Sequence, residues 1–371
     1  MNKKIIGILV CMLLIITAVP AVGTMNEKEN PETLGICSNS LGQINTRETT
    51  MSYDRGSLFI QTPRDTQGSF VSDTGSGWKV FDDFWDIASP ICDIHWWGQC
   101  LKYTDEWYNY DPSGMTFKIE FYSDNNSKPG DLLCSYDSIS PTPIPTGIWY
   151  HYEPRDVYFE LYYFETDLEP CCQISNGWVS IESTYVPSGG WFMWFWSLDG
   201  NRQMFQSYEG VLQKYFTDAS FVLTDDTEDP TPDLECDGEL DWTDVPIGSN
   251  VSGDFVVRNN GDTGSILHWK VESYPNWGSN WTFTPNASVL TIGDDWITID
   301  VEAIAPEDKN EEFTGEVKLV NVMDPSDSCT IDVSLVTPKN KPFIHNFPIF
   351  SWLFEHFPNA FPILRLVLGL I

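Results

Sequence analysis

Thr116-Phe-Lys-Ile-Glu-Phe121 alternates polar and apolar side chains without interruption. Successive side chains of a strand point to opposite faces, so Phe117, Ile119 and Phe121 share one face and the polar residues share the other. The pattern predicts a half-buried β-strand. The residues that follow at 124–130, Asp-Asn-Asn-Ser-Lys-Pro-Gly, are typical of a turn.

Short runs of this kind recur through residues 76–224, separated by turn clusters such as Pro187-Ser-Gly-Gly190. Strands at this spacing predict a β-sandwich of the jelly-roll type. In Trp191-Phe-Met-Trp-Phe-Trp196 every side chain is large and apolar, so either both faces are covered or one face is a binding surface. Strands are expected at 79–87, 91–98, 115–123, 132–136, 148–153, 157–164, 177–183, 191–197, 203–208 and 219–224.

Residues 234–338 have the length and rhythm of an immunoglobulin-like sandwich. Residues 225–233 are rich in Asp and Pro, which predicts an extended linker before it. The expected fold class is therefore all-β, with two β-sandwich domains, the first jelly-roll-like and the second immunoglobulin-like. Strands of the second domain are expected at 240–245, 252–259, 266–273, 281–284, 297–303, 315–321 and 329–336.

Residues 1–23 have the pattern of a secretory signal peptide, with lysines at 3 and 4, an apolar run and small residues before a polar stretch. A retained membrane anchor is the alternative, although the apolar run is short for one. Residues 24–75 are poor in aromatics and are expected to be flexible, with 58–61 as a candidate strand. Residues 342–371 are apolar and interrupted by prolines. We expect a short C-terminal helix there, which either attaches or sorts the protein at the membrane or envelope or docks on its own domain.

If the chain is exported, its cysteines are expected to form disulfides. Cys11 falls in the signal peptide, and an even number of cysteines remains in the mature chain, which predicts disulfides. Cys236 and Cys329 bracket the second sandwich and are expected to pair; free or otherwise paired thiols are the alternative. Cys92-Asp-Ile-His95 could instead belong to a zinc site, but an oxidising compartment favours disulfides. Pairing is left open for the others: Cys37, Cys92, Cys100, Cys134, Cys171 and Cys172.

The formal net charge of −34 predicts a surface that repels nucleic acid and anionic lipid headgroups. The chain contains no phosphate loop, dinucleotide fingerprint, nucleophile elbow or His-Glu-x-x-His pattern, so no catalytic residue is assigned. Carboxylate pairs for glycoside hydrolysis are too common in so acidic a chain to be informative. The oxygen-rich segment 124–130 makes calcium the one cofactor to consider, although its lysine argues against it, and no metal site is assigned.

The chain contains 16 tryptophans, which either fill sandwich cores or offer stacking surfaces for sugars and proteins. Candidate ligand-contacting residues are Trp97, Trp107, Trp191, Trp194 and Trp196. Four Asn-x-Ser/Thr sequons are candidate glycosylation sites in an exported protein. They begin at Asn125, Asn250, Asn280 and Asn286.

Three stretches, Val80-Phe-Asp-Asp-Phe-Trp85, Ile94-His-Trp-Trp-Gly98 and 117–130, resemble a jelly-roll-type module of secreted bacterial and archaeal proteins. Residues 234–337 resemble an immunoglobulin-like module that accompanies it in archaeal surface proteins. The tail from Phe357 resembles a recurring C-terminal tail of exported archaeal proteins. The resemblance implies an architecture and a surface location, and it implies no catalytic residues.

The expected function is that of a non-enzymatic secreted or cell-surface protein. Its Trp-rich domain would bind an extracellular glycan, an envelope component or a surface protein. An extracellular hydrolase or its carbohydrate-binding accessory domain is one alternative, and a structural spacer of the envelope is another. Exposed tryptophan rings would favour binding, whereas buried rings would favour the spacer.

Overall fold

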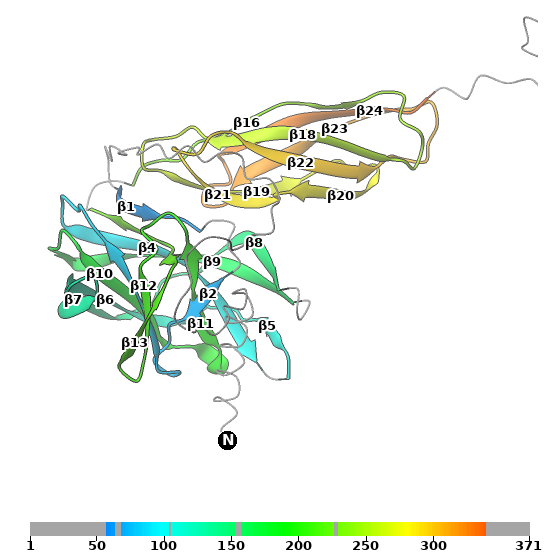
Figure 1. The fold of residues 1–371 in the computed structure, drawn as a ribbon. Coiled ribbons are helices and arrows are strands. Elements are labelled where there is room, and N and C mark those ends of the chain that lie inside the picture. Colours follow the sequence, from blue (N-terminus) through cyan, green and yellow to red (C-terminus); the bar gives the residue numbers. More distant parts are fainter. Residues whose placement is uncertain (1–56, 64–67, 104, 153–156, 226–228, 339–371) are drawn as a thin grey trace, which may run out of the picture.

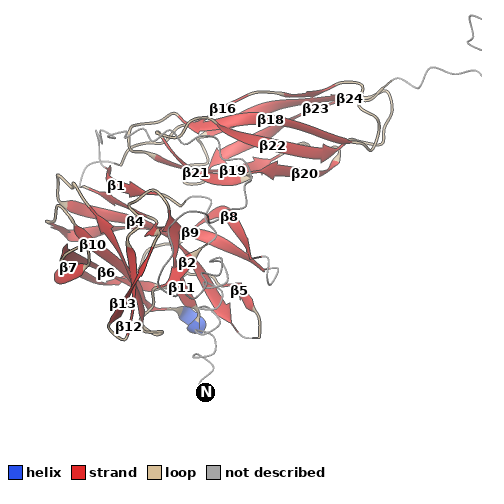
Figure 2. Cartoon of the chain, in the orientation of Figure 1, coloured by secondary structure: helices blue, strands red, loops and turns tan. Residues whose placement is uncertain are grey.

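The computed structural model describes residues 57–63, 68–103, 105–152, 157–225 and 229–338. Apart from one 3-10 turn at Pro187–Gly189, the regular structure of these residues is all strand (Figure 2), which confirms the all-β prediction. None of the described segments is a helix long and apolar enough to cross a membrane. The expected signal peptide (1–23) and apolar tail (342–371) lie outside the described residues.

The first sandwich packs a nine-stranded sheet against a six-stranded sheet (Figure 1). The larger sheet consists of β1 (Ser57–Gln61), β2 (Ser69–Val71), β4 (Ile91–Tyr103), β5 (Trp107–Asn109), β8 (Ile144–Tyr152), β9 (Val157–Cys172), β11 (Trp191–Ser197), β14 (Asp218–Ala219) and β15 (Phe221–Thr224). The smaller sheet runs β13 (Val211–Tyr215), β12 (Met204–Tyr208), β3 (Trp78–Phe84), β10 (Gly177–Tyr185), β6 (Thr116–Asp124) and β7 (Pro129–Ile139).

The alternation of β6 directs three fully buried side chains, Phe117, Ile119 and Phe121, into the core between the sheets. The opposite face of β6 is not simply solvated, because Glu120 is buried there and pairs with Lys79 and Lys118. In β11 both faces are covered along most of the strand. The all-apolar run of β11 therefore reflects burial on two sides.

The sequence predicts that the first sandwich begins at residue 76. In the structure it begins earlier, with strands β1 and β2. Strand β1 pairs with β15, and β2 pairs with β11. Phe59 and Phe70 are buried in the core from these strands. The candidate strand at 58–61 is thus confirmed as β1. Residues 68–75 are not the flexible segment expected, because Phe70 and its neighbours are ordered by strands distant in sequence.

The second sandwich packs a four-stranded sheet against a five-stranded sheet around Trp269 and Phe255. All seven predicted strands are present, and two more, β16 and β21, complete the sheets. The first sheet runs β16 (Leu234–Asp237), β18 (Asn250–Asn259), β22 (Ile297–Ile304) and β20 (Ser279–Thr284). The second runs β17 (Leu240–Trp242), β24 (Ser328–Val336), β23 (Glu312–Asn321), β19 (Ile266–Ser273) and β21 (Ala287–Thr291).

Three disulfides form among the described residues, which is compatible with an extracellular protein. They join Cys236 to Cys329, as predicted, Cys92 to Cys171, and Cys134 to Cys172. Cys37 lies outside the described residues.

Cys100 departs from the disulfide prediction, because it is a free and fully buried thiol. Its Sγ lies 3.5 Å from the Met115 sulfur in the first core, and burial raises the pKa of the thiol. Cys100 is therefore a small core residue.

The second sandwich lies across one face of the larger sheet of the first (Figure 1). An apolar group, here called the junction cluster, spans the boundary between them. Its buried members are Trp97, Leu161, Tyr163, Phe195 and Val222 from the first sandwich and Val289 from β21 of the second. Ile266 and Met323 of the second sandwich pack against it. The two sandwiches thus share a buried apolar contact in addition to the linker.

Candidate functional site

Strand β4 places three polar or amphipathic side chains at the boundary between the sandwiches. Asp93, His95 and Trp97 lie on one face of the strand, while Ile94 and Trp96 lie on the other, within the first core. His95 pairs across the strands with Glu165 of β9, and Trp97 pairs with Tyr163. The face of the sheet that meets the second sandwich therefore carries charge at one end and aromatic rings at the other.

His95 is held by a hydrogen-bonded relay. The Tyr163 hydroxyl donates to the Glu165 carboxylate at 2.8 Å, and its oxygen is hydrogen-bonded to Nδ1 of His95. Because the tyrosine proton is committed to Glu165, Nδ1 of His95 is the donor in the second bond. The relay fixes the ring orientation and, in the neutral ring, the tautomer in which Nε2 carries the lone pair. Burial disfavours the charged ring, but the hydrogen bond to Glu165 and the charges of Asp93 and Asp229 outweigh it and raise the pKa of His95.

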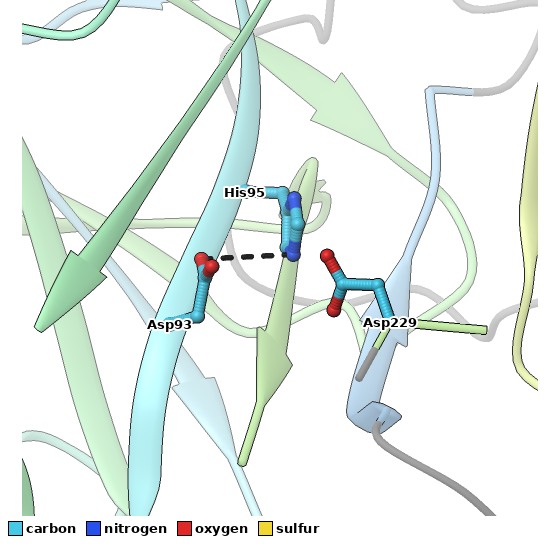
Figure 3. Close-up of side chains that lie close together, drawn as sticks. All are labelled: Asp93, His95 and Asp229. Atoms are coloured by element: carbon cyan, nitrogen blue, oxygen red, sulfur yellow. Dashed lines mark ion pairs between the residues drawn. The ribbon is translucent and has the colours of Figure 1, made fainter. Parts of the chain in front are cut away.

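The free nitrogen faces carboxylates. Nε2 of His95 lies 3.6 Å from Oδ1 of Asp93, and a ligand atom of Asp229, from the linker, completes a group of three within 4.8 Å of one another (Figure 3). Oδ1 of Asp93 is buried and has no hydrogen-bond partner among the described residues. Burial raises the pKa of Asp93 to about 6, against the lowering effect of His95. We refer to Asp93, His95 and Asp229 as the Asp–His group, and it could hold a metal ion.

Beside this group, Trp97 makes a polar contact across the boundary. Its indole Nε1–H donates to Nε2 of His268 on β19 at 2.9 Å, and the His268 ring packs edge-on against Tyr163. His268 is fully enclosed, and desolvation lowers its pKa to about 3. His268 is therefore a neutral acceptor that couples the two sandwiches.

This burial predicts an acid-sensitive stability. Between about pH 6.5 and 3 the unfolded chain protonates His268 and the folded chain does not, so the free energy of unfolding falls as the pH falls. His268→Gln keeps an acceptor for Trp97 but cannot titrate. From pH 7.5 to 4.5 the wild type should lose about 3 kcal/mol more than this variant, as measured by urea unfolding. Equal losses in both proteins would contradict the assignment.

A cavity of about 170 Å³ opens between the sandwiches next to the Asp–His group. Its lining includes His95, Tyr163, Asp229 and His268, together with Ser57, whose hydroxyl donates to the Gly264 carbonyl at 3.0 Å. A larger hollow, of about 490 Å³, lies on the second sandwich, and its lining includes the carboxylates of Glu239, Asp241, Glu316 and Asp332. Of these two hollows, the smaller is the one that adjoins the Asp–His group.

The structure places the candidate tryptophans mostly in cores. Trp97 is fully buried in the junction cluster, Trp191 and Trp194 are buried, and Trp196 is partly buried against Phe70. The side chain of Trp107 lies outside what the structure describes. The rings of Trp97, Trp191 and Trp194 therefore offer no open face to a ligand.

The candidate sequons and the candidate calcium segment lie at the surface. Asn125, Asn250, Asn280 and Asn286 are all exposed. In the 124–130 turn the Asp124 carboxylate accepts hydrogen bonds from Trp178 and from the Ser127 amide, so its oxygens already have protein donors.

Two of the three members of the Asp–His group, Asp93 and His95, could be placed together from the sequence. Asp93 and His95 stand two apart in a predicted strand, which places them on one face, and His95 had been considered as a zinc ligand together with cysteines. Cys92 is instead in a disulfide, and the third residue of the group is Asp229. Only the packing of the linker beside β4 brings Asp229 to this place.

No family model and no curated protein matches this chain. A solved structure of the Vibrio cholerae VesB protease is 10% identical to it, with coverage of 75% of this chain and 100% of that one. The TM-score of that superposition is 0.21, which carries no argument about fold or activity.

Proposed function

We propose that this chain is an exported, non-enzymatic surface protein whose two β-sandwiches act as one rigid spacer. The observation that carries the proposal is the junction cluster, in which Trp97 is fully buried against the second sandwich and hydrogen-bonded to His268. Burial of an aromatic ring with its polar atom satisfied disfavours separation of the two halves. The burial of Trp191 and Trp194 supports a spacer more than a tryptophan-lined binding face.

The rigid-spacer proposal predicts that the junction, rather than the linker, sets the arrangement of the sandwiches. Ten Gly and Ser residues inserted between Asp225 and Asp229 should leave the small-angle X-ray scattering profile of the full chain close to that of the wild type, apart from the added mass. A linker-held pair would instead gain a broad range of separations, because a flexible linker spans more space as it lengthens. Broadening of this kind on insertion would overturn the proposal.

One surface feature favours glycan binding as a second function. On the β8–β9 hairpin Trp149 and Tyr158 are 49% and 54% exposed, and the Tyr158 ring stacks on His151 with centroids 4.4 Å apart. Glu160 lies opposite Trp149 across the hairpin. Exposed aromatic rings beside a carboxylate combine a stacking face with hydrogen-bond acceptors, as sugar binding requires.

Glycan binding through the hairpin predicts a residue-specific loss. On a glycan array, Trp149→Ala should weaken binding of the full chain at least tenfold, whereas Tyr185→Ala, which removes an equally exposed aromatic from another strand, should leave it unchanged. Absence of binding to any glycan, or equal losses in both variants, would remove this function.

A further inference from the structure

The Asp–His group joins two segments that are distant in sequence. Asp93 and His95 lie on β4, and Asp229 lies in the linker that enters the second sandwich. His95 is buried, and the relay through Tyr163 to Glu165 leaves Nε2 of the neutral ring with its lone pair directed at the group. Fixing one ring nitrogen as a donor so that the other can act as a ligand is the arrangement by which proteins prepare a metal-binding histidine.

The side chains of the Asp–His group concentrate negative charge at one place, which favours the binding of a positively charged group there. Two carboxylates, of Asp93 and Asp229, lie beside Nε2 of His95, and Oδ1 of Asp93 is buried without a hydrogen bond, so the group favours a positive charge at Nε2, either a proton or a metal ion. The 3.6 Å between Nε2 and Oδ1 is too long for a good hydrogen bond. It is close to the separation, roughly 3.3 to 3.5 Å, of two atoms that each lie about 2.0 to 2.1 Å from one tetrahedral ion.

A comparison within the chain shows that burial of a carboxylate does not by itself imply an ion. Asp82 is fully buried, yet one of its oxygens accepts the amide of Asp83 at 3.0 Å and the other accepts the amide of Ala219 at 2.6 Å. Backbone donors thus satisfy Asp82. Oδ1 of Asp93 has no such donor among the described residues.

We propose that Asp93, His95 and Asp229 bind a divalent transition-metal ion of the Zn²⁺ class. One imidazole and two carboxylates suit such ions, whereas Ca²⁺ takes oxygen ligands alone. The adjoining cavity leaves room for water as a further ligand. The ion ties the linker to β4 beside the junction cluster, and this role in rigidity rests on the proposed function, whereas the binding of the ion does not.

The test is titration of the chelator-treated full chain with ZnCl₂, followed by calorimetry in the presence of excess Mg²⁺, which occupies surface carboxylates. One site of micromolar affinity or better is expected. Asp229→Asn should weaken it at least tenfold, and because Asp229 is exposed this variant should fold. Asp237→Asn, an exposed carboxylate at the end of β16, is the matched control and should bind as the wild type does.

Zinc X-ray absorption should show one imidazole nitrogen and otherwise oxygen ligands. Lack of a discrete site, or equal weakening by Asp229→Asn and Asp237→Asn, would overturn the metal site. Scattering of the same samples reports separately on the spacer. A chain that binds zinc but shows independently moving sandwiches supports the site and overturns the spacer. A rigid chain that binds no zinc supports the spacer and overturns the metal site.

Discussion

Trp97→Ala should release the two sandwiches from each other while leaving each of them folded. The substitution removes the largest side chain of the junction cluster and the hydrogen bond to His268. Replacing a buried tryptophan by alanine costs about 3–5 kcal/mol, and here that cost falls on the contact between domains. Small-angle scattering of the full chain should change from one arrangement to a range of separations.

The adjacent residue provides the control. Trp96 is also fully buried on β4, but its ring points into the first core and stacks on Phe164. Trp96→Ala should lower the unfolding free energy of the first sandwich by a similar amount and leave the folded arrangement intact. Hydrogen exchange resolved along the sequence separates the two effects. Unfolding of the first sandwich by Trp97→Ala, with no gain in domain motion, would contradict the assignment of its ring to the junction.

The double variant Cys236→Ala/Cys329→Ala should destabilise the second sandwich by about 4–5 kcal/mol on the chain-entropy estimate for a loop of this length. The disulfide joins β16 to β24, with a sequence separation of 93, so it constrains nearly the whole domain in the unfolded state. Denaturant unfolding, with hydrogen exchange to identify the domain that opens, measures the loss.

Cys100→Ala is the control for removal of sulfur without loss of a disulfide. Cys100 is a free thiol in the first core, so its substitution should cost only about 1 kcal/mol and should not affect the second sandwich. A double variant at Cys236 and Cys329 as stable as the wild type would show that this disulfide contributes little to the stability of the domain.

Local pattern was enough to predict most of the strands. The alternation in β6 and the turn residues after it identified a half-buried strand, and β11 and β19 were predicted at the bounds they have. Strand β13 was missed because its residues are mostly exposed, so its sequence does not alternate between apolar and polar residues. Strands β2 and β5 were missed because three residues are too few to show a period.

The position of the candidate site could not be predicted, because it depends on contacts between domains. Trp96 and Trp97 are alike in the sequence, and alternation places them on opposite faces without saying what covers the outer one. The second sandwich covers the Trp97 face with Ile266, Val289 and His268. Trp97, which the sequence suggested as a ligand contact, therefore packs in the junction between the two sandwiches.

The members of the Asp–His group could not be predicted for the same reason. Acidic residues are so frequent in this chain that no local pattern distinguishes Asp229 from its neighbours. Its role depends on the path of the linker past β4, where His95 is oriented by Tyr163 and Glu165.

Backbone amide relaxation measured by nuclear magnetic resonance on the full chain tests the rigid two-domain unit most directly. If the junction cluster holds the sandwiches together, amides of residues 68–224 and 234–336 should report one rotational correlation time, that of a body containing both domains. Two shorter and different correlation times, each fitting a single sandwich, would show that the domains tumble independently and would contradict the account.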